Sequence, residues 1–206
     1  MRTCHWVLIG CAIALVLTVG VPSLASATVF FGGSGDVFCL IGSIRSSNEG
    51  RGADTIILEA GTYTFTVADN TVDFPFSPGT SPGQGNALPS ITGRVTIQGA
   101  GPTETILDGS SLLRLFHIAA SGKLTLHGLT IQNGSMFRGD GGAIFNRGTL
   151  TVSETVIRDN RSAFSSGGGG IFSVGTLRIV DSRVTNNQTP EGIFGGGILS
   201  DGRCTF

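Results

Sequence analysis

The stretch GGAIFN, residues 141–146, is followed by GGGIFS at 168–173 and by GGGILS at 195–200. Each copy begins 27 residues after the one before it. Self-similarity at a fixed period of about 20 to 50 residues is typical of solenoids, in which each repeat is one structural unit packed on the next. The repeat therefore predicts a solenoid.

Other residues follow the same period, so the repeat is more than one short motif. Three sets define a common alignment of the units, and we expect each set to form one structural column. The first is Ile118, Ile144, Ile171 and Ile198, the second is Gly122, Gly148, Gly175 and Gly202, and the third is Asn133, Asn160 and Asn187.

Short alternating segments indicate the secondary structure of each unit. LTL (124–126), LTV (150–152) and LRI (177–179) read apolar-polar-apolar, which turns one side of a strand inward. The repeats contain no apolar run with helical spacing. A unit of short strands joined by glycine and asparagine predicts one coil of a parallel β-helix, with coils stacked at about 4.8 Å.

The glycines and asparagines are interpreted as turn residues. Gly148 and Gly175 are expected where the turn needs a positive φ or a close neighbouring backbone. The asparagines are expected at bends, since asparagine tolerates left-handed backbone. They also lie in the sequences NGS, NRS and NQT, which match the glycosylation pattern. We interpret these as repeated turn chemistry.

Several segments resemble a known group of proteins. GADTIILEAGTYTFT (52–66), VTIQGAGPTETILDG (95–109) and LTLHGLTIQNG (124–134) resemble secreted bacterial right-handed β-helix proteins of the pectin-lyase-like superfamily. The GGAI phrase with IRDN (157–160) and VTNN (184–187) is similar to repeats of chlamydial polymorphic outer membrane proteins, although Ile157 and Val184 replace the usual phenylalanine. The resemblance implies an all-β, right-handed parallel β-helix.

A further resemblance concerns the start of the domain. CLIGSIRSSN (39–48) resembles a decayed Cys-Ser-Leu-Arg-Glu-Ala segment, with Cys39 retained and Gly42-Ser43 in place of Arg-Glu. In the proteins it resembles, that segment is a short helix on the first coil. The resemblance therefore implies an N-terminal capping helix.

The beginning of the chain has the layout of an export signal. A basic end precedes an apolar run from Val7 to Val21, and Ala25 to Ala27 read ASA, so cleavage is expected before Thr28. A transmembrane anchor is the alternative, but the run is short. LIGC, ending at Cys11, resembles a lipobox, although most of the apolar run follows the cysteine. An uncleaved anchor and lipidation at Cys11 are the less favoured interpretations.

The remaining residues, 28–206, are predicted to form a single β-helix domain. Residues 28–50 form the N-terminal cap, 72–88 form a proline-rich surface loop, and 118–206 form regular coils of about 27 residues. The final GRCTF aligns with the start of the next strand. We therefore expect a fragment of a longer product that self-associates through an uncapped C-terminal coil.

The sequence offers few candidates for chemistry. Glu154 and Asp181 share a position in adjacent coils and are weak candidates for a calcium site. Asp140 stands alone, and His117 is predicted to be an outward strand residue. His127 resembles the His-Gly of polygalacturonases only as a dipeptide, and the sequence has no aspartate cluster beside it of the kind that such a hydrolase needs. No catalytic residue and no cofactor are predicted. The formal net charge of −1 offers no basic patch for nucleic acid.

Binding is the remaining function class. Phe145, Phe172 and Leu199 each follow an inward isoleucine and are predicted to form an outward contact stripe, unless a loop such as 161–167 covers them. We expect an exported, non-catalytic surface or adhesin-like protein, secreted or on the cell surface, that contacts a host or cell-surface protein or glycan. The alternative is a lyase or hydrolase acting on an acidic polysaccharide.

Overall fold

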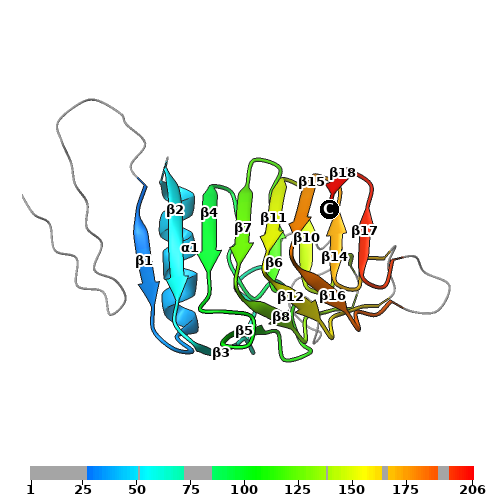
Figure 1. Ribbon diagram of the computed structural model, residues 1–206, viewed down its shortest axis with the longest axis horizontal. Helices are drawn as coiled ribbons and strands as arrows, with labels where there is room; N and C mark the ends of the chain where they lie inside the picture. The colour runs from blue at the N-terminus through cyan, green and yellow to red at the C-terminus, as the bar shows by residue number, and fades with distance from the viewer. Residues whose placement is uncertain (1–26, 51, 72–84, 138, 164–166, 190–194) are drawn as a thin grey trace, which may run out of the picture.

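A computed structural model of the chain shows a parallel β-helix with a short helix near the start of its described part (Figure 1). The structure describes residues 27–50, 52–71, 85–137, 139–163, 167–189 and 195–206. The expected signal run and Cys11 lie outside the described residues, as does most of the expected surface loop, residues 72–84.

One face of the solenoid is a seven-stranded parallel sheet with the order β1-β2-β4-β7-β11-β15-β18. Inward positions along it carry stacked aliphatic side chains such as Val95, Leu124, Leu150 and Leu177, each at most 3% exposed. Burying such a side chain contributes about 1.5 to 3 kcal/mol. The strands are β1 (Val29–Gly32), β2 (Ala53–Leu58), β4 (Arg94–Gln98), β7 (Lys123–His127), β11 (Thr149–Ser153), β15 (Thr176–Val180) and β18 (Arg203–Thr205).

Three further sheets complete the coils, and all their paired strands run parallel. A five-stranded sheet contains β3 (Gly61–Thr64), β5 (Thr105–Asp108), β8 (Thr130–Gln132), β12 (Val156–Arg158) and β16 (Arg183–Thr185). A four-stranded sheet contains β6 (Phe116–Ile118), β10 (Ile144–Asn146), β14 (Ile171–Ser173) and β17 (Ile198–Ser200). β9 (Ser135–Met136) and β13 (Arg161–Ser162) form a pair.

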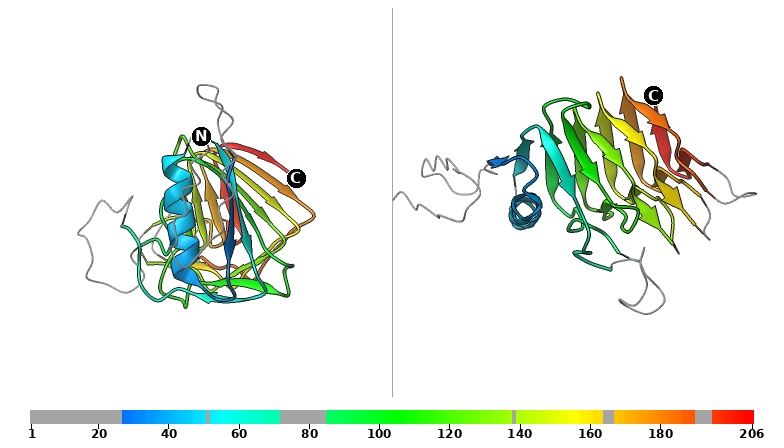
Figure 2. Two further views of the ribbon diagram at one scale, coloured as in Figure 1. Left: turned by 90° about the vertical axis from the view of Figure 1, so that its left-hand side faces the viewer. Right: turned by 90° about the horizontal axis from the view of Figure 1, so that it is seen from below.

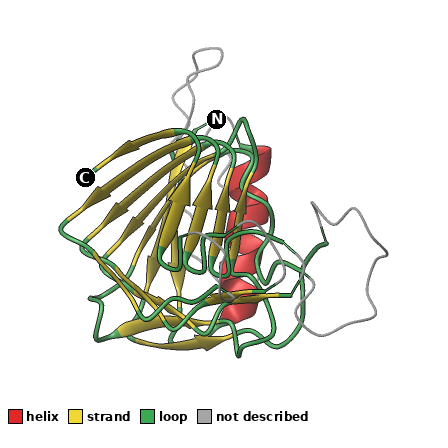
Figure 3. Ribbon diagram, turned by 90° about the vertical axis from the view of Figure 1, so that its right-hand side faces the viewer, coloured by secondary structure: helices red, strands yellow, loops and turns green. Residues whose placement is uncertain are grey.

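The coils are stacked along the long axis of the molecule (Figures 2 and 3). Seen along the long axis, the strands of each sheet lie one behind another, with the apolar core between the sheets (Figure 3). Seen from below, successive coils follow each other in chain order (Figure 2). The predicted all-β parallel β-helix is confirmed.

The helix α1, Val37–Glu49, lies beside the first coils and contacts β1, β2 and β4 (Figure 2). The Asp36 carboxylate caps its N-terminus by accepting a hydrogen bond from Cys39 N at 2.9 Å. Leu40 and Ile44 are fully buried against the coils, whereas Phe38 is exposed. The short helix expected near the N-terminus is therefore present.

The isoleucine alignment inferred from the sequence needs one correction. Ile144 pairs with Phe116, and Ile118 pairs instead with Asn146. The cause is the turn before the seven-stranded sheet: β6 ends at Ile118 and β7 begins at Lys123, whereas β10 ends at Asn146 and β11 begins at Thr149. The turn between β6 and β7 is two residues longer than the turn between β10 and β11. The number of residues that separates a residue from its partner in the next coil therefore differs before and after the turn.

Two kinds of glycine position account for the repeated motif. Gly141, Gly168 and Gly195, the first residue of each quoted copy, have φ of 70°, 68° and 70°. Gly148 and Gly175 do not have positive φ; they are needed because the neighbouring backbone is close. A Cβ on Gly148 would lie 2.3 Å from Gly122 O, and one on Gly175 would lie 2.1 Å from Gly148 O.

The asparagines also divide into two columns. Strand pairing aligns Asn133 with Asp159 and Asn186, and these three residues have φ of 52°, 57° and 54°. Asn160 and Asn187 lie one position later, in the column of Gly134. The predicted single column is therefore wrong for Asn133. It occupies the left-handed bend that was expected, but the other two asparagines do not.

Tyr63, the single tyrosine of the chain, joins the first coil to the N-terminal segment. It is fully buried, and its hydroxyl donates a hydrogen bond to Gly33 O at 2.9 Å. Burial, with a contribution from the Glu59 carboxylate, raises the pKa of Tyr63 above its ordinary value.

Because the folded chain holds Tyr63 neutral, stability should depend on pH in the alkaline range. The stability contributed by the neutral phenol is present below about pH 10, where the unfolded chain ionises, and is lost as pH rises through the higher folded pKa. We expect Tyr63→Phe to remove that loss. Phenolate absorbance measures the titration directly, and ionisation of the native protein at the same pH as the denatured protein would contradict the prediction.

Candidate ligand-contact surface

The outward side of the five-stranded sheet carries a row of polar side chains. Leu107, Ile131 and Ile157 point inward and are fully buried, so the residue after each points outward. Strand pairing places Asp108 beside Gln132, and Gln132 beside Arg158. We call Asp108, Gln132, Asn133, Arg158 and Asp159 the polar strip.

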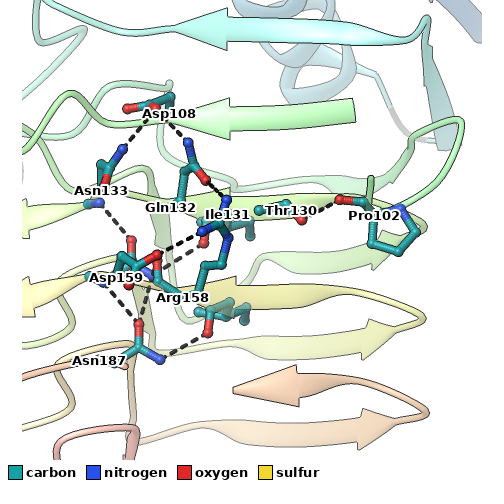
Figure 4. A network of polar contacts seen from close by, with 12 residues as sticks. Pro102, Asp108, Thr130, Ile131, Gln132, Asn133, Arg158, Asp159 and Asn187 are labelled. Carbon is teal, nitrogen blue, oxygen red and sulfur yellow. Dashed lines mark hydrogen bonds and ion pairs between the residues drawn. The ribbon is translucent and has the colours of Figure 1, made fainter. Parts of the chain in front are cut away.

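Hydrogen bonds join the members of the polar strip across successive coils (Figure 4). Asp108 Oδ2 accepts from Gln132 Nε2 at 2.8 Å and from Asn133 Nδ2 at 2.9 Å. Gln132 Oε1 in turn accepts from Arg158 Nη2. Arg158 Nη1 lies 3.0 Å from Asp159 Oδ2. The side chains are therefore held in fixed positions relative to one another.

The strip remains open to solvent. The side chains of Arg158 and Asp159 are 43% and 38% exposed. An ion pair with this exposure contributes only about 0 to 1 kcal/mol, because water screens it. The strip therefore adds little to stability, while its guanidinium and carboxylates can still bond to a ligand.

The predicted contact stripe occupies the outward side of the four-stranded sheet. His117, Phe145, Phe172 and Leu199 stack in one column. The ring centroids of Phe145 and Phe172 are 5.5 Å apart, and those of His117 and Phe145 are 5.8 Å apart. These rings point away from the core but are largely covered.

The predicted contact stripe is not an open surface, because its side chains are buried or only partly exposed. Phe172 is only 7% exposed, and the guanidinium of Arg114 lies over Phe145, 5.1 Å from the ring centroid. Arg114 is itself buried at 2% exposure, and it donates to Asn86 Oδ1 at 2.7 Å and to Asp140 O at 2.9 Å. Sequence reasoning did not identify Arg114, although an arginine inside the apolar run LLRLF (112–116) was a visible signal.

A serine and a histidine approach each other beside this stack. Ser90 Oγ and His117 Nδ1 are 2.8 Å apart, which is the spacing of a nucleophile and its base. His117, however, is 2% exposed. A polymer substrate cannot reach that imidazole. His127 lies on the seven-stranded sheet, not on the four-stranded sheet that carries His117, and its Nδ1 is 3.1 Å from Ser153 Oγ.

Glu154 and Asp181 do share one position in successive coils, as the strand pairing before them requires. Both are exposed, and both have φ of 46°. Gly128 occupies the same position in the preceding coil with φ of 63°. In the part of the chain that the structure describes, no three potential metal-ligating side chains gather at one place. The two carboxylates are turn residues whose position favours glycine.

This geometry leads to a stability prediction for Glu154→Gly. Glycine removes the cost of left-handed backbone but adds entropy to the unfolded chain, so the free energy of unfolding should rise by about 0.5 to 1 kcal/mol. Chemical denaturation measures the difference, and Glu154→Gln, which removes only the charge, is the matched control. A calcium-dependent rise in Tm that Glu154→Gly abolishes would instead establish a metal site.

The arrangement as a whole defines a parallel β-solenoid with a half-exposed polar strip along one side. No family model, no curated protein and no solved structure matches the chain. Within the described ranges, no helix is both long and apolar enough to cross a membrane.

Proposed function

We propose that this protein is an exported, non-catalytic β-helix of a cell surface or secreted fraction that contacts a glycan or protein through its polar strip. The main support for this proposal is the series of hydrogen bonds from Asp108 through Gln132 to Arg158, which crosses three adjacent coils. These side chains remain partly exposed to solvent. A rigid, pre-organised row of donors and acceptors loses little conformational entropy on binding. Such a row suits an extended ligand.

Export and ancestry form part of the same proposal. The apolar run before Ala27 supports export, and the segments quoted above support a relation to pectin-lyase-like β-helix proteins and to chlamydial surface repeats. The short helix beside the first coils supports the relation of CLIGSIRSSN to capping segments of exported proteins. Many functions occur on one fold, so the activity is argued from the strip alone.

One observation favours the alternative, an enzyme acting on an acidic polysaccharide. The strip places an arginine between two carboxylates, since Arg158 contacts Asp159 and is linked through Gln132 to Asp108. A lyase requires a basic group near the sugar acid, and a hydrolase requires two carboxyl groups beside the bond that is cut. The formation of new chain ends in a bound polymer distinguishes an enzyme from a binding protein.

We expect the exported protein to bind at least one polymer of a panel of neutral and uronic-acid polysaccharides without shortening it. Arg158→Ala should weaken that binding about tenfold or more, because a hydrogen bond to a charged group contributes about 1.5 to 3 kcal/mol. Arg178→Ala, on the exposed side of the seven-stranded sheet, is the matched control. Equal affinities for parent and Arg158→Ala, or the appearance of new chain ends, would contradict the proposal.

A further inference from the structure

A carboxylate occupies an inward position of the solenoid where the coils that follow have an apolar side chain. Asp54 pairs with Val95 in the next coil. The same position is occupied in the following coils by Leu124, Leu150 and Leu177. Asp54 is only 4% exposed. An ionised carboxylate at such a position is costly unless a partner compensates its charge.

The described surroundings of Asp54 supply a hydrogen bond but no cation. Asp54 Oδ1 accepts from the backbone N–H of Thr28 at 2.7 Å. Its Oδ2 lies beside the C-terminal end of α1, 3.4 Å from where a Cβ on Gly50 would be. The last turn of α1 contains no basic residue, and the exposed carbonyls of a helix C-terminus carry partial negative charge. The site therefore favours a positive charge.

The residue that faces Asp54 is also the expected first residue of the processed chain. Val29 pairs with Thr55, and Thr55 N donates to Thr28 O at 2.9 Å, so Thr28 lies directly over Asp54 in the adjacent strand. Ala27, on the other side of the peptide bond, is exposed. The nitrogen of the Ala27–Thr28 bond is the atom that already contacts the carboxylate.

We propose that hydrolysis of the Ala27–Thr28 bond creates an α-ammonium group on Thr28 that forms a partly buried ion pair with Asp54 and fixes the first strand. This inference rests on the proposed export. A signal-peptidase-type protease and water are the reactants: the C–N bond breaks, the water oxygen joins the Ala27 carbonyl carbon, and the released amine takes up protons to become ammonium.

The geometry makes the pair specific for this cleavage position. The nitrogen is already 2.7 Å from Asp54 Oδ1, so the new charge needs no rearrangement to reach its partner. Adjacent residues of a strand are about 3.3 Å apart and alternate in direction. Cleavage one residue earlier or later therefore moves the ammonium away from the carboxylate. A charge-assisted hydrogen bond is also about twice as strong as the bond from a neutral amide.

The first experiment expresses the full chain in an exporting bacterium and determines the N-terminus of the exported protein by mass spectrometry and sequencing. We expect Thr28 at the N-terminus. Asp54→Asn should lower Tm of the exported protein by about 5 °C or more, since the ammonium then lacks its counter-charge. Asp201→Asn, which removes an exposed carboxylate, is the matched control and should leave Tm unchanged.

The second measurement reads the amine itself and does not depend on stability. Lys123 is the single lysine of the sequence and is exposed, so in Lys123→Arg the α-amine is the one amine left after processing. Because a paired ammonium resists acylation, adding Asp54→Asn should raise the acylation rate of Thr28 about tenfold. This comparison remains informative if Asp54→Asn is less stable but still folded.

Each outcome decides the inference separately from the proposed function. An N-terminus other than Thr28, including an uncut exported chain, overturns it. Thr28 at the N-terminus with unchanged Tm and unchanged acylation in Asp54→Asn also overturns it, and then the carboxylate has another role. None of these results bears on polymer binding by the polar strip, which the Arg158→Ala comparison tests independently.

Discussion

Gly175→Val is expected to destabilise the solenoid by about 3 kcal/mol or more, because the added side chain has no space in the stacked turn. Its Cβ would lie 2.1 Å from Gly148 O and 2.8 Å from Arg147 O. Gly148 O cannot move away freely, since it accepts the hydrogen bond from Thr176 N at 2.8 Å. Relieving the collision therefore breaks the pairing of adjacent coils.

Chemical denaturation of parent and variant measures the effect, and Gly175→Ala separates the collision from β-branching. Alanine should produce most of the loss, because the first side-chain carbon makes the contact. Gly42, in the exposed part of α1, has open space around it, with nothing within 4 Å of the place that a Cβ would take. Gly42→Ala is the control and should be neutral or stabilising. Parent-like stability of Gly175→Ala would show that the coils are farther apart than described.

Sequence periodicity predicted this part of the fold because the residues involved keep nearly the same spacing, 26 and then 27 residues, from one coil to the next. Leu124, Leu150 and Leu177 pair directly, and the glycines before their strands stack with them. The same reasoning failed at Ile118, since an alignment by residue type does not reveal a turn that is two residues longer. A β-helix can lengthen a turn without changing its strands, so spacing measured across a turn is less reliable than spacing within a sheet.

The candidate site was harder to predict than the fold. Asp108, Gln132 and Arg158 are three different residue types at one structural position, so no repeated letter marks the polar strip. Phe145 and Phe172 form a visible repeat, but their burial depends on Arg114 and other parts of the chain that alternation does not describe. Asp54 appears in the sequence as an ordinary strand residue. Its unusual position is apparent only from its pairing with Val95.

The second large effect is expected at Asn160, whose side chain connects three coils inside the solenoid. Asn160 is 1% exposed. Its Oδ1 accepts from Gly134 N at 2.6 Å, and its Nδ2 donates to Arg158 O and to Asn187 Oδ1, both at 2.8 Å. Asn187 continues the ladder by donating to Ile157 O at 2.9 Å. The amide thus hydrogen-bonds backbone groups of its own coil and of the preceding coil.

Asn160→Asp should therefore destabilise the protein by about 3 kcal/mol or more at neutral pH, although the two side chains have nearly the same shape. The substitution replaces the donating nitrogen by an oxygen that faces two acceptors, and it buries a charge without a partner. Asn186→Asp makes the identical chemical change at an exposed bend and should change stability by less than about 0.5 kcal/mol. Denaturation curves of both variants decide the matter. If Asn160→Asp unfolds like Asn186→Asp, the buried ladder does not hold the coils together, and lowering the pH, which protonates the new carboxyl group, should then have no restoring effect either.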